Sequence, residues 1–242
     1  MQGGTIRLFK FRGVQVYLHF SWFIVAAYQL TQRLNNYHSQ IFAAYEYLAL
    51  FAIVLLHEFG HALACRQTGG SADHIILWPL GGIAFVDPPR RPGAVLWSIA
   101  AGPLVNVALV PVLEMLWIFA GRPGWFDDVA DPIRLILMIR VINYILLIFN
   151  LLPIYPLDGG QILRALLWFP LGEIRSLQIA SVIGLIGGAC LAIYALMGWS
   201  FWLGIMAFFL LSRAIAGWQQ AKAMVAEEAA RTASPPPIYP RS

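Results

Sequence analysis

Two histidines stand four residues apart in an apolar stretch, and a glutamate directly follows the first: the segment reads His57-Glu58-Phe59-Gly60-His61. Residues at positions i and i+4 of a helix share a face, so both imidazoles can reach one metal ion. Glu58 can then take a proton from a metal-bound water. Because three ionisable groups are costly in a hydrophobic span, the pattern favours a metal site over interfacial polar residues.

A catalytic zinc site usually has three protein ligands and a water, so a third ligand is needed. Asp158 is the favoured candidate, because it follows Pro153 and Pro156 in a stretch that cannot continue a helix. Irregular backbone at membrane depth is tolerated where it lines a cavity or is buried in protein. The alternative is that Asp158 caps the helix predicted over residues 161–169. A cap requires neither the prolines nor a setting within the membrane.

Other side chains compete for a place in this site. His74 is the rival third ligand, although it precedes a strand-like segment beside Asp73. Cys65 lies one helical turn after His61, but three ligands from one straight helix give poor tetrahedral geometry, so a small buried hydrophobe is expected there. His19 is read as an interfacial anchor. Arg140 must find a partner within its span or extend to the interface.

The composition places these residues in a membrane protein. Of 242 residues, 60% are hydrophobic and 12% are charged, whereas soluble domains carry about a quarter charged residues. The charged residues occur between long apolar stretches, which are typical of transmembrane helices. We therefore predict an all-α polytopic membrane protein in a lipid bilayer, with about six transmembrane helices and a small membrane-embedded strand segment around residues 74–86. The predicted spans cover residues 14–31, 41–64, 93–120, 132–152, 176–197 and 199–211.

The charges also predict an orientation. The net charge is +4, but the basic residues do not form a patch for nucleic acid, and they follow the positive-inside rule instead. Placing both termini in the cytoplasm, at the plasma membrane, leaves three basic residues outside. The inward set is Arg7, Lys10, Arg12, Arg66, Arg90, Arg91, Arg164, Arg175, Arg213, Lys222, Arg231 and Arg241, and the outward set is Arg33, Arg122 and Arg134. Residues 1–225 are expected to form one core, and residues 226–242 a disordered cytoplasmic tail.

Four motifs in this order resemble the site-2 protease family of intramembrane zinc metalloproteases. They are His57-Glu-Phe-Gly-His61, Pro79-Leu-Gly-Gly82, Ala101-Gly-Pro-Leu-Val-Asn106, and Asn150-Leu-Leu-Pro-Ile-Tyr-Pro-Leu-Asp158-Gly-Gly. The resemblance implies that His57, His61 and Asp158 hold one Zn²⁺ and that Glu58 is the general base. It also implies that Asn150 positions substrate or stabilises the tetrahedral intermediate, and that transmembrane proteins are the substrates.

The resemblance is to the compact prokaryotic type of the family. About a dozen residues separate the third and fourth predicted spans, which leaves no room for an inserted PDZ domain, and about thirty follow the sixth, too few for a CBS pair. Two other functions use the same residues. One is an inactive membrane scaffold or chaperone, which has no use for Glu58. The other is a metal transporter, which requires more acidic or histidine residues along a path.

Overall fold

The computed structural model describes residues 4–33, 37–78, 81–120 and 130–233. The chain divides into two units, Met1–Leu151 and Leu152–Ser242. The first unit contains β1 (Thr5–Phe11), β2 (Val14–His19), α1 (Ser21–Arg33), α2 (Gln40–Gln67), β3 (Ser71–Trp78), β4 (Gly81–Asp87), α3 (Pro92–Ala120) and α4 (Ala130–Leu151). The second contains α5 (Asp158–Met197) and α6 (Phe201–Ala233).

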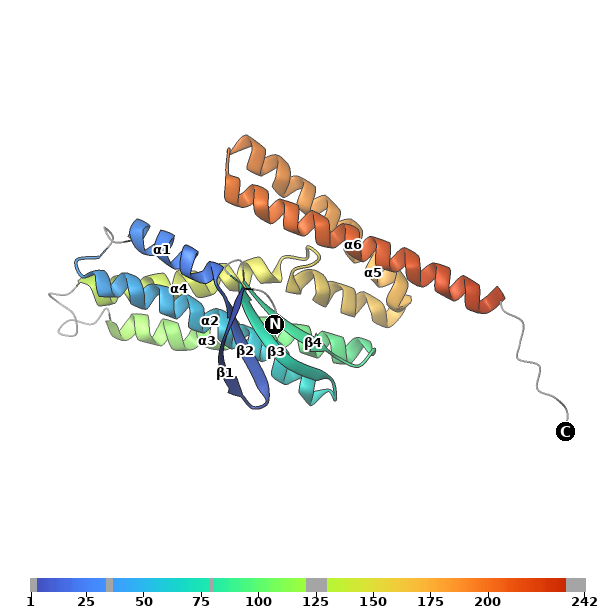
Figure 1. The fold of residues 1–242 in the computed structure, drawn as a ribbon, viewed down its shortest axis with the longest axis horizontal. Coiled ribbons are helices and arrows are strands. Elements are labelled where there is room, and N and C mark those ends of the chain that lie inside the picture. The colour runs from blue at the N-terminus through green and yellow to red at the C-terminus, as the bar shows by residue number, and fades with distance from the viewer. Residues whose placement is uncertain (1–3, 34–36, 79–80, 121–129, 234–242) are drawn as a thin grey trace. The chain divides into compact units, whose positions relative to one another are not determined.

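The four strands form one sheet in the order β1-β2-β3-β4 (Figure 1). β2 pairs antiparallel with β1 and parallel with β3, and β3 pairs antiparallel with β4. The strands of the expected segment 74–86 are confirmed as β3 and β4, while Pro79 and Leu80 lie outside the described residues. They belong to a larger sheet than the sequence predicted.

Residues 14–31, expected to be the first span, are not one continuous helix. Residues 14–19 form β2, and the helix that follows, α1, has only 13 residues. The hairpin between β1 and β2 turns at Arg12 and Gly13, both with positive φ, and β-branched Val14 and Val16 suit the strand that follows. Their apolar side chains face protein instead of lipid, so hydropathy alone misassigned this stretch.

The sheet packs against α2 through a buried apolar cluster. Val16 of β2 and Ile75 of β3 contribute to it, as do Phe59 and Ala62 from the same turns of α2 as the HEFGH motif. The cluster fixes the motif-bearing part of α2 against the strands. Alternate residues of β2 and β3 supply it, as the period of two in a strand requires.

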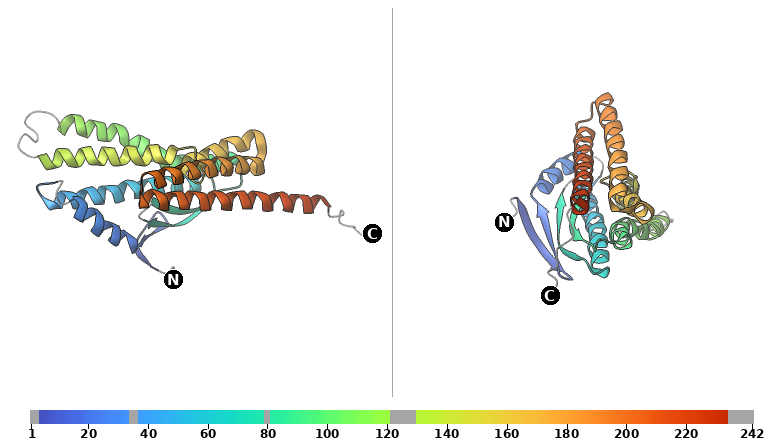
Figure 2. Two further views of the ribbon diagram at one scale, coloured as in Figure 1. Left: turned by 90° about the horizontal axis from the view of Figure 1, so that it is seen from above. Right: turned by 90° about the vertical axis from the view of Figure 1, so that its right-hand side faces the viewer.

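α2, α3 and α4 lie side by side in the first unit (Figure 2). They contain the spans predicted over residues 41–64 and 93–120, and the span predicted over 132–152 ends one residue after α4. Within this bundle Arg140 of α4 donates hydrogen bonds to both carboxylate oxygens of Glu114 of α3, at 2.7–3.0 Å. Tyr144 also donates a hydrogen bond to Glu114. The guanidinium carbon of Arg140 lies 4.8 Å from the centroid of the Trp117 ring. Arg140 thus has its partner, Glu114, in the neighbouring span.

The second unit is a hairpin of α5 and α6. α5 runs through 40 residues and is bent at Gly172, which has φ 80° and follows Pro170 by two residues. The part after the bend contains the span predicted over residues 176–197. α6 contains nearly all of the last predicted span and continues to Ala233. Residues 226–233 of the expected tail are therefore helical, because alanine and glutamate there favour helix; residues 234–242 lie outside the described part.

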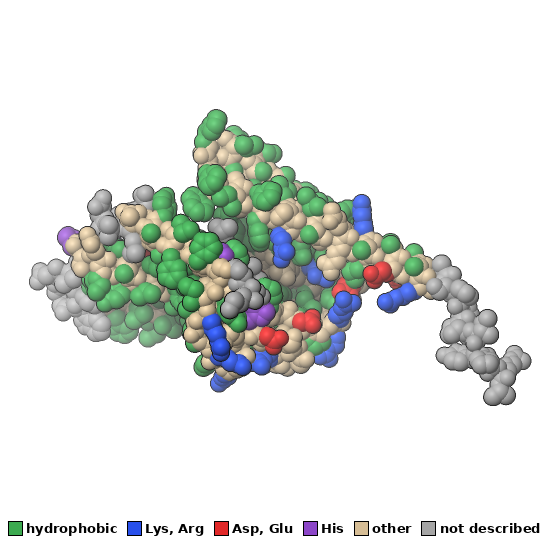
Figure 3. Space-filling model, in the orientation of Figure 1, with side chains coloured by type: hydrophobic (Ala, Val, Ile, Leu, Met, Phe, Trp, Pro, Cys, Tyr) green, Lys and Arg blue, Asp and Glu red, His purple; other side chains and the backbone are tan. Residues whose placement is uncertain are grey.

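Within the described part of the chain, five helices are long and apolar enough to cross a membrane: α2, α3, α4, α5 and α6. Their surfaces keep large apolar side chains exposed (Figure 3), among them Ile118, Ile148 and Phe208. Exposed apolar surface of this extent is unfavourable in water and suits contact with lipid. The chain is therefore a multi-pass membrane protein.

Candidate metal centre

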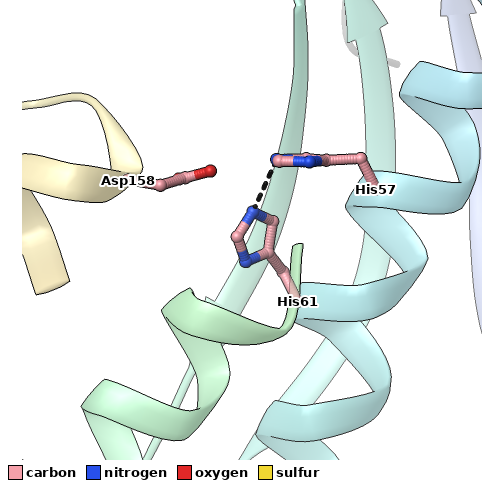
Figure 4. Close-up of side chains that lie close together, drawn as sticks. All are labelled: His57, His61 and Asp158. Carbon is pink, nitrogen blue, oxygen red and sulfur yellow. Dashed lines mark hydrogen bonds between the residues drawn. The ribbon is translucent and has the colours of Figure 1, made fainter. Parts of the chain in front are cut away.

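His57 and His61 meet on the buried face of α2. Each residue is 6% exposed, and their Nε2 atoms lie 3.1 Å apart (Figure 4). The pairing follows from the helix, because side chains four residues apart lie one turn above each other. The sequence prediction that the two rings share one face is therefore correct.

Hydrogen bonds at the other ring nitrogens determine where each proton sits. His57 Nδ1 lies 2.6 Å from Oδ1 of Asn106, and His61 Nδ1 lies 2.9 Å from the backbone carbonyl oxygen of Ser98. Both oxygens accept hydrogen bonds, so each Nδ1 carries the proton and each neutral ring presents a lone pair at Nε2. Such bonds from the outer nitrogen are the usual support of a metal-bound histidine.

The two facing lone pairs fit a cation. With both protons on Nδ1, neither Nε2 carries a hydrogen, so the 3.1 Å contact drawn as a dashed line in Figure 4 requires a cation, a proton or a metal ion, between the two atoms. Two nitrogens bound tetrahedrally to zinc at about 2.0–2.1 Å stand roughly 3.3 Å apart. The donor types and their spacing therefore fit a zinc ion.

Glu58 lies against β4. The residue is 6% exposed, and its Oε2 accepts a hydrogen bond of 3.0 Å from the backbone N–H of Ala84. Gly82 makes this approach possible, because a Cβ there would lie 2.1 Å from Glu58 Cγ. β4 thus orients the carboxylate of Glu58, the residue that directly follows His57 in α2.

Two glycines bring α3 close to the histidines. A Cβ on Gly60 of α2 would lie 2.6 Å from the carbonyl oxygen of Ala101, and one on Gly102 of α3 would lie 2.2 Å from His61 Nε2. No other residue type fits at either position without movement of the backbone or the ring. Both glycines lie in the motifs quoted above, but their spacing gives no sign that Gly60 accommodates Ala101 or that Gly102 accommodates His61.

The remaining expected site residues lie at the junction of the two units in the sequence. Asn150 is half-buried near the carboxyl end of α4, and Asp158 is the half-buried first residue of α5 (Figure 4). The N-cap of α5 is Leu157, and the cap position makes no side-chain hydrogen bond. Asp158 is thus the first residue inside α5 and not its N-cap.

Small residues of the second unit hold the segment that precedes Asp158. A Cβ on Gly160 would lie 2.3 Å from the backbone nitrogen of Tyr155, and one on Gly184 would lie 2.4 Å from the carbonyl oxygen of Tyr155. Gly217 of α6 accommodates the Tyr155 ring in the same way, with a would-be Cβ 2.9 Å from Cε1. The backbone leading to Asp158 is therefore packed tightly on α5 and α6.

The rival ligands have other environments. His74 of β3 stacks on Phe85 at 4.3 Å between ring centroids, and Cys65 is buried with its Sγ donating to the carbonyl of Ser71 at 3.3 Å. His19 stacks on Trp78 at 3.8 Å. Each of these three side chains therefore has a contact outside the pair of His57 and His61.

Sequence reasoning missed Asn143. It lies in α4, is fully buried, and hydrogen-bonds to Asn106, the partner of His57. A single asparagine in an apolar helix belongs to no motif that we recognised. The signal available was the cost of burying an amide in a membrane helix, which requires a hydrogen-bonding partner.

Comparisons with known proteins agree with these features. The model of peptidase family M50 matches residues 45–131 and 127–194. A zinc metalloprotease of Methanocaldococcus jannaschii is 34% identical over 180 residues, covering 74% of this chain and 50% of that protein. A Synechocystis sp. protein provisionally named a zinc metalloprotease is 28% identical over 232 residues, covering 87% of this chain and 59% of that protein. The chain thus spans between half and three fifths of the length of these curated relatives.

A solved structure is also similar. The site-2 protease from Methanocaldococcus jannaschii matches with a TM-score of 0.61 and 30% sequence identity, covering 88% of this chain and 95% of that one. The family resemblance carried by the four motifs is therefore confirmed. The chain belongs to peptidase family M50, the family of the site-2 proteases.

Proposed function

We propose that this protein is a zinc-dependent intramembrane protease that hydrolyses peptide bonds within transmembrane segments of other membrane proteins. The observation that carries the proposal is the pair of buried Nε2 lone pairs of His57 and His61 on a membrane-spanning helix, with Glu58 beside them. Metal-dependent peptide hydrolysis needs a general base next to the metal, and this helix supplies two candidate ligands and the base.

We further propose that Asp158 completes the ligand set and that each chain holds one zinc ion. Two histidines and a carboxylate form a common protein donor set for catalytic zinc. The tight packing of Tyr155 against Gly160 and Gly184 supports this role, because it fixes the backbone that leads to Asp158. When bound there, zinc supplies a Lewis acid that lowers the pKa of a water ligand and polarises a carbonyl.

The chain's own residues then move the protons. Glu58 accepts a proton from the attacking water and delivers it to the leaving amine, first as a base and then as an acid. The N–H of Ala84 supports this role because it orients the carboxylate of Glu58. Asn150 is proposed to donate its side-chain amide to the oxyanion that develops on the scissile carbonyl.

The substrate is proposed to bind as an extended strand along β4. This strand is at the edge of the sheet, and Ala84 directs its N–H away from β3 toward Glu58. Because alternate residues of an antiparallel strand point the same way, Gly82 and Val86 also direct backbone groups to the open edge. A segment added to this edge would pass beside Glu58 with its peptide bonds exposed, which the helical form does not allow.

We propose that both termini face the cytoplasm and that the protein lies in the plasma membrane. The hairpin of β1 and β2 carries Arg7, Lys10 and Arg12, and Arg66 lies at the last turn of α2, with the sheet directly after it. Arg90 and Arg91 follow β4. This concentration of basic residues at the sheet end of the first unit is typical of a cytoplasmic face.

The test pairs zinc content with cleavage. Wild type, Glu58→Gln and Asp158→Ala are purified in detergent, bound zinc is measured by mass spectrometry, and single-span substrates are offered. Wild type is expected to hold about one zinc and to cleave, and Asp158→Ala to lose zinc. Glu58→Gln is expected to keep its zinc and to cleave roughly 10²–10⁴-fold more slowly.

Each competing function predicts a different result. Cleavage by Glu58→Gln at the wild-type rate would exclude Glu58 as the base. Zinc binding without cleavage of any substrate would favour a scaffold, and zinc flux in vesicles would favour a transporter. Full zinc retention by Asp158→Ala would remove Asp158 from the ligand set.

A further inference from the structure

Two asparagines without an assigned role lie behind the zinc ligand His57. Asn106 of α3 and Asn143 of α4 are both 0% exposed. Asn143 Nδ2 donates to the backbone carbonyl oxygen of Asn106 at 3.0 Å, and Asn106 Nδ2 donates to Asn143 Oδ1 at 2.9 Å. Asn106 Oδ1 in turn lies 2.6 Å from His57 Nδ1. These contacts form one chain from a backbone carbonyl to the ring of His57.

The direction of every hydrogen bond in this chain follows from its first member. A backbone carbonyl oxygen accepts and never donates, so the Asn143 amide must turn its NH₂ group toward Asn106. Its Oδ1 then faces the Asn106 side chain and must accept, which requires the NH₂ group of Asn106 there. The remaining oxygen of Asn106 faces His57, so the hydrogen on His57 must sit on Nδ1.

We propose that Asn143 and Asn106 are positioning residues that hold His57 in the Nδ1–H tautomer and so keep the lone pair of Nε2 directed to the zinc site. In the other tautomer, the lone pair of Nδ1 would face the Asn106 oxygen at 2.6 Å, and the hydrogen on Nε2 would occupy the position of the metal. The relay makes that state unfavourable before any metal arrives. The proposal rests on zinc binding by His57, and its test does not depend on proteolysis.

Asn143 is the informative position because it does not touch the histidine. Without its side chain, the amide of Asn106 is free to rotate and to present NH₂ to His57, which favours the wrong tautomer. Loss of outer partners of metal-bound histidines lowers metal affinity by about 10–100-fold. An asparagine that only joined α3 to α4 would alter stability without altering the tautomer.

The first experiment reads the tautomer directly in metal-free wild type. The chain has five histidines, so nitrogen-15 labelling of histidine gives a small set of ring signals, and the His57→Ala variant assigns one of them. At a pH where the ring is neutral, the relay requires His57 to carry its proton on Nδ1. A proton on Nε2 of His57 would overturn the proposal without any relay variant having to fold.

The second experiment measures zinc affinity by competition with a chromophoric chelator. Asn143→Leu is expected to bind zinc about 10–100-fold more weakly than wild type, with His57 populating both tautomers. Tyr144→Phe is the matched control, because it removes a hydrogen bond from the adjacent residue, to Glu114, and leaves the relay intact. Equal zinc affinity of Asn143→Leu and wild type would also overturn the relay. Failure of wild type to bind zinc would instead contradict the proposed function.

Discussion

Gly102→Ala tests how α3 makes room for His61, the proposed zinc ligand. A Cβ at this position would lie 2.2 Å from His61 Nε2 and 2.4 Å from Cε1, whereas ordinary contacts begin at 3.4 Å. The ring or the helix must therefore move by about 1.2 Å. Retreat of α3 would open the close α2–α3 interface that Gly60 allows at the backbone of Ala101, so we expect the imidazole to move instead.

A movement of this size is large for a metal site. Zinc–nitrogen bonds of about 2.0–2.1 Å tolerate roughly 0.2 Å of error, so His61 would cease to bind in its present position. We expect zinc affinity to fall at least ~100-fold, which corresponds to about 2.7 kcal/mol. Alanine favours a helix over glycine by about 1 kcal/mol. Helix propensity alone would therefore stabilise the variant and cannot explain a loss of zinc.

The assay is chelator competition on purified protein, with Co²⁺ substitution as a spectroscopic check of the ligand geometry. Gly204→Ala provides the control, because it is the same chemical change in α6, where a Cβ would meet nothing within 4 Å. The control should bind zinc as wild type does. If Gly102→Ala also binds as wild type does, with an unaltered Co²⁺ spectrum, the reasoning about space beside His61 is refuted.

Two further predictions concern neighbouring contacts. Gly82→Ala should push away the carboxylate of Glu58 and so reduce cleavage at least ~10²-fold, while the zinc measured by mass spectrometry stays at the wild-type level; unchanged cleavage would contradict the contact with β4. Arg140→Met should lower the thermal unfolding midpoint in detergent, because it leaves Glu114 without its cation. The double change Arg140→Met with Glu114→Gln should lose clearly less in the same thermal unfolding assay, and an equal loss would show that the ion pair is not responsible.

The sequence was sufficient for the part of the site that one helix carries. The spacing of His57 and His61 fixes their common face, and the cost of burying charges distinguishes them from interfacial residues. The strands over residues 74–86 were predicted because apolar and polar residues alternate weakly there and the run Trp78-Pro79-Leu80-Gly81-Gly82 does not favour a helix. Local periodicity determines features of this kind.

Contacts between residues far apart in the sequence could not be predicted from local periodicity. The run over residues 14–31 is apolar whether it faces lipid or the α2 cluster, so its hydropathy cannot separate β2 and α1 from a span. The importance of Asn143 follows only from its hydrogen bond with Asn106, 37 residues earlier. That of Gly102 follows only from its close contact with His61. The partner of Arg140 was not predicted either, because two charges in separate spans reveal no pairing until α3 and α4 are side by side.

The ion pair of Glu114 and Arg140 also bears on how the protein is made. An arginine at the centre of an inserting helix costs about 2.5–3.5 kcal/mol on the scale of cellular insertion, and α4 carries Arg140 near its middle. α3 precedes it with Glu114, and residues 121–129 join the two helices. The pair therefore enters a bilayer more favourably as a neutral hairpin than as two successive helices. Since the same two helices carry Asn106 and Asn143, the pairing that neutralises these charges also brings together the two asparagines behind His57.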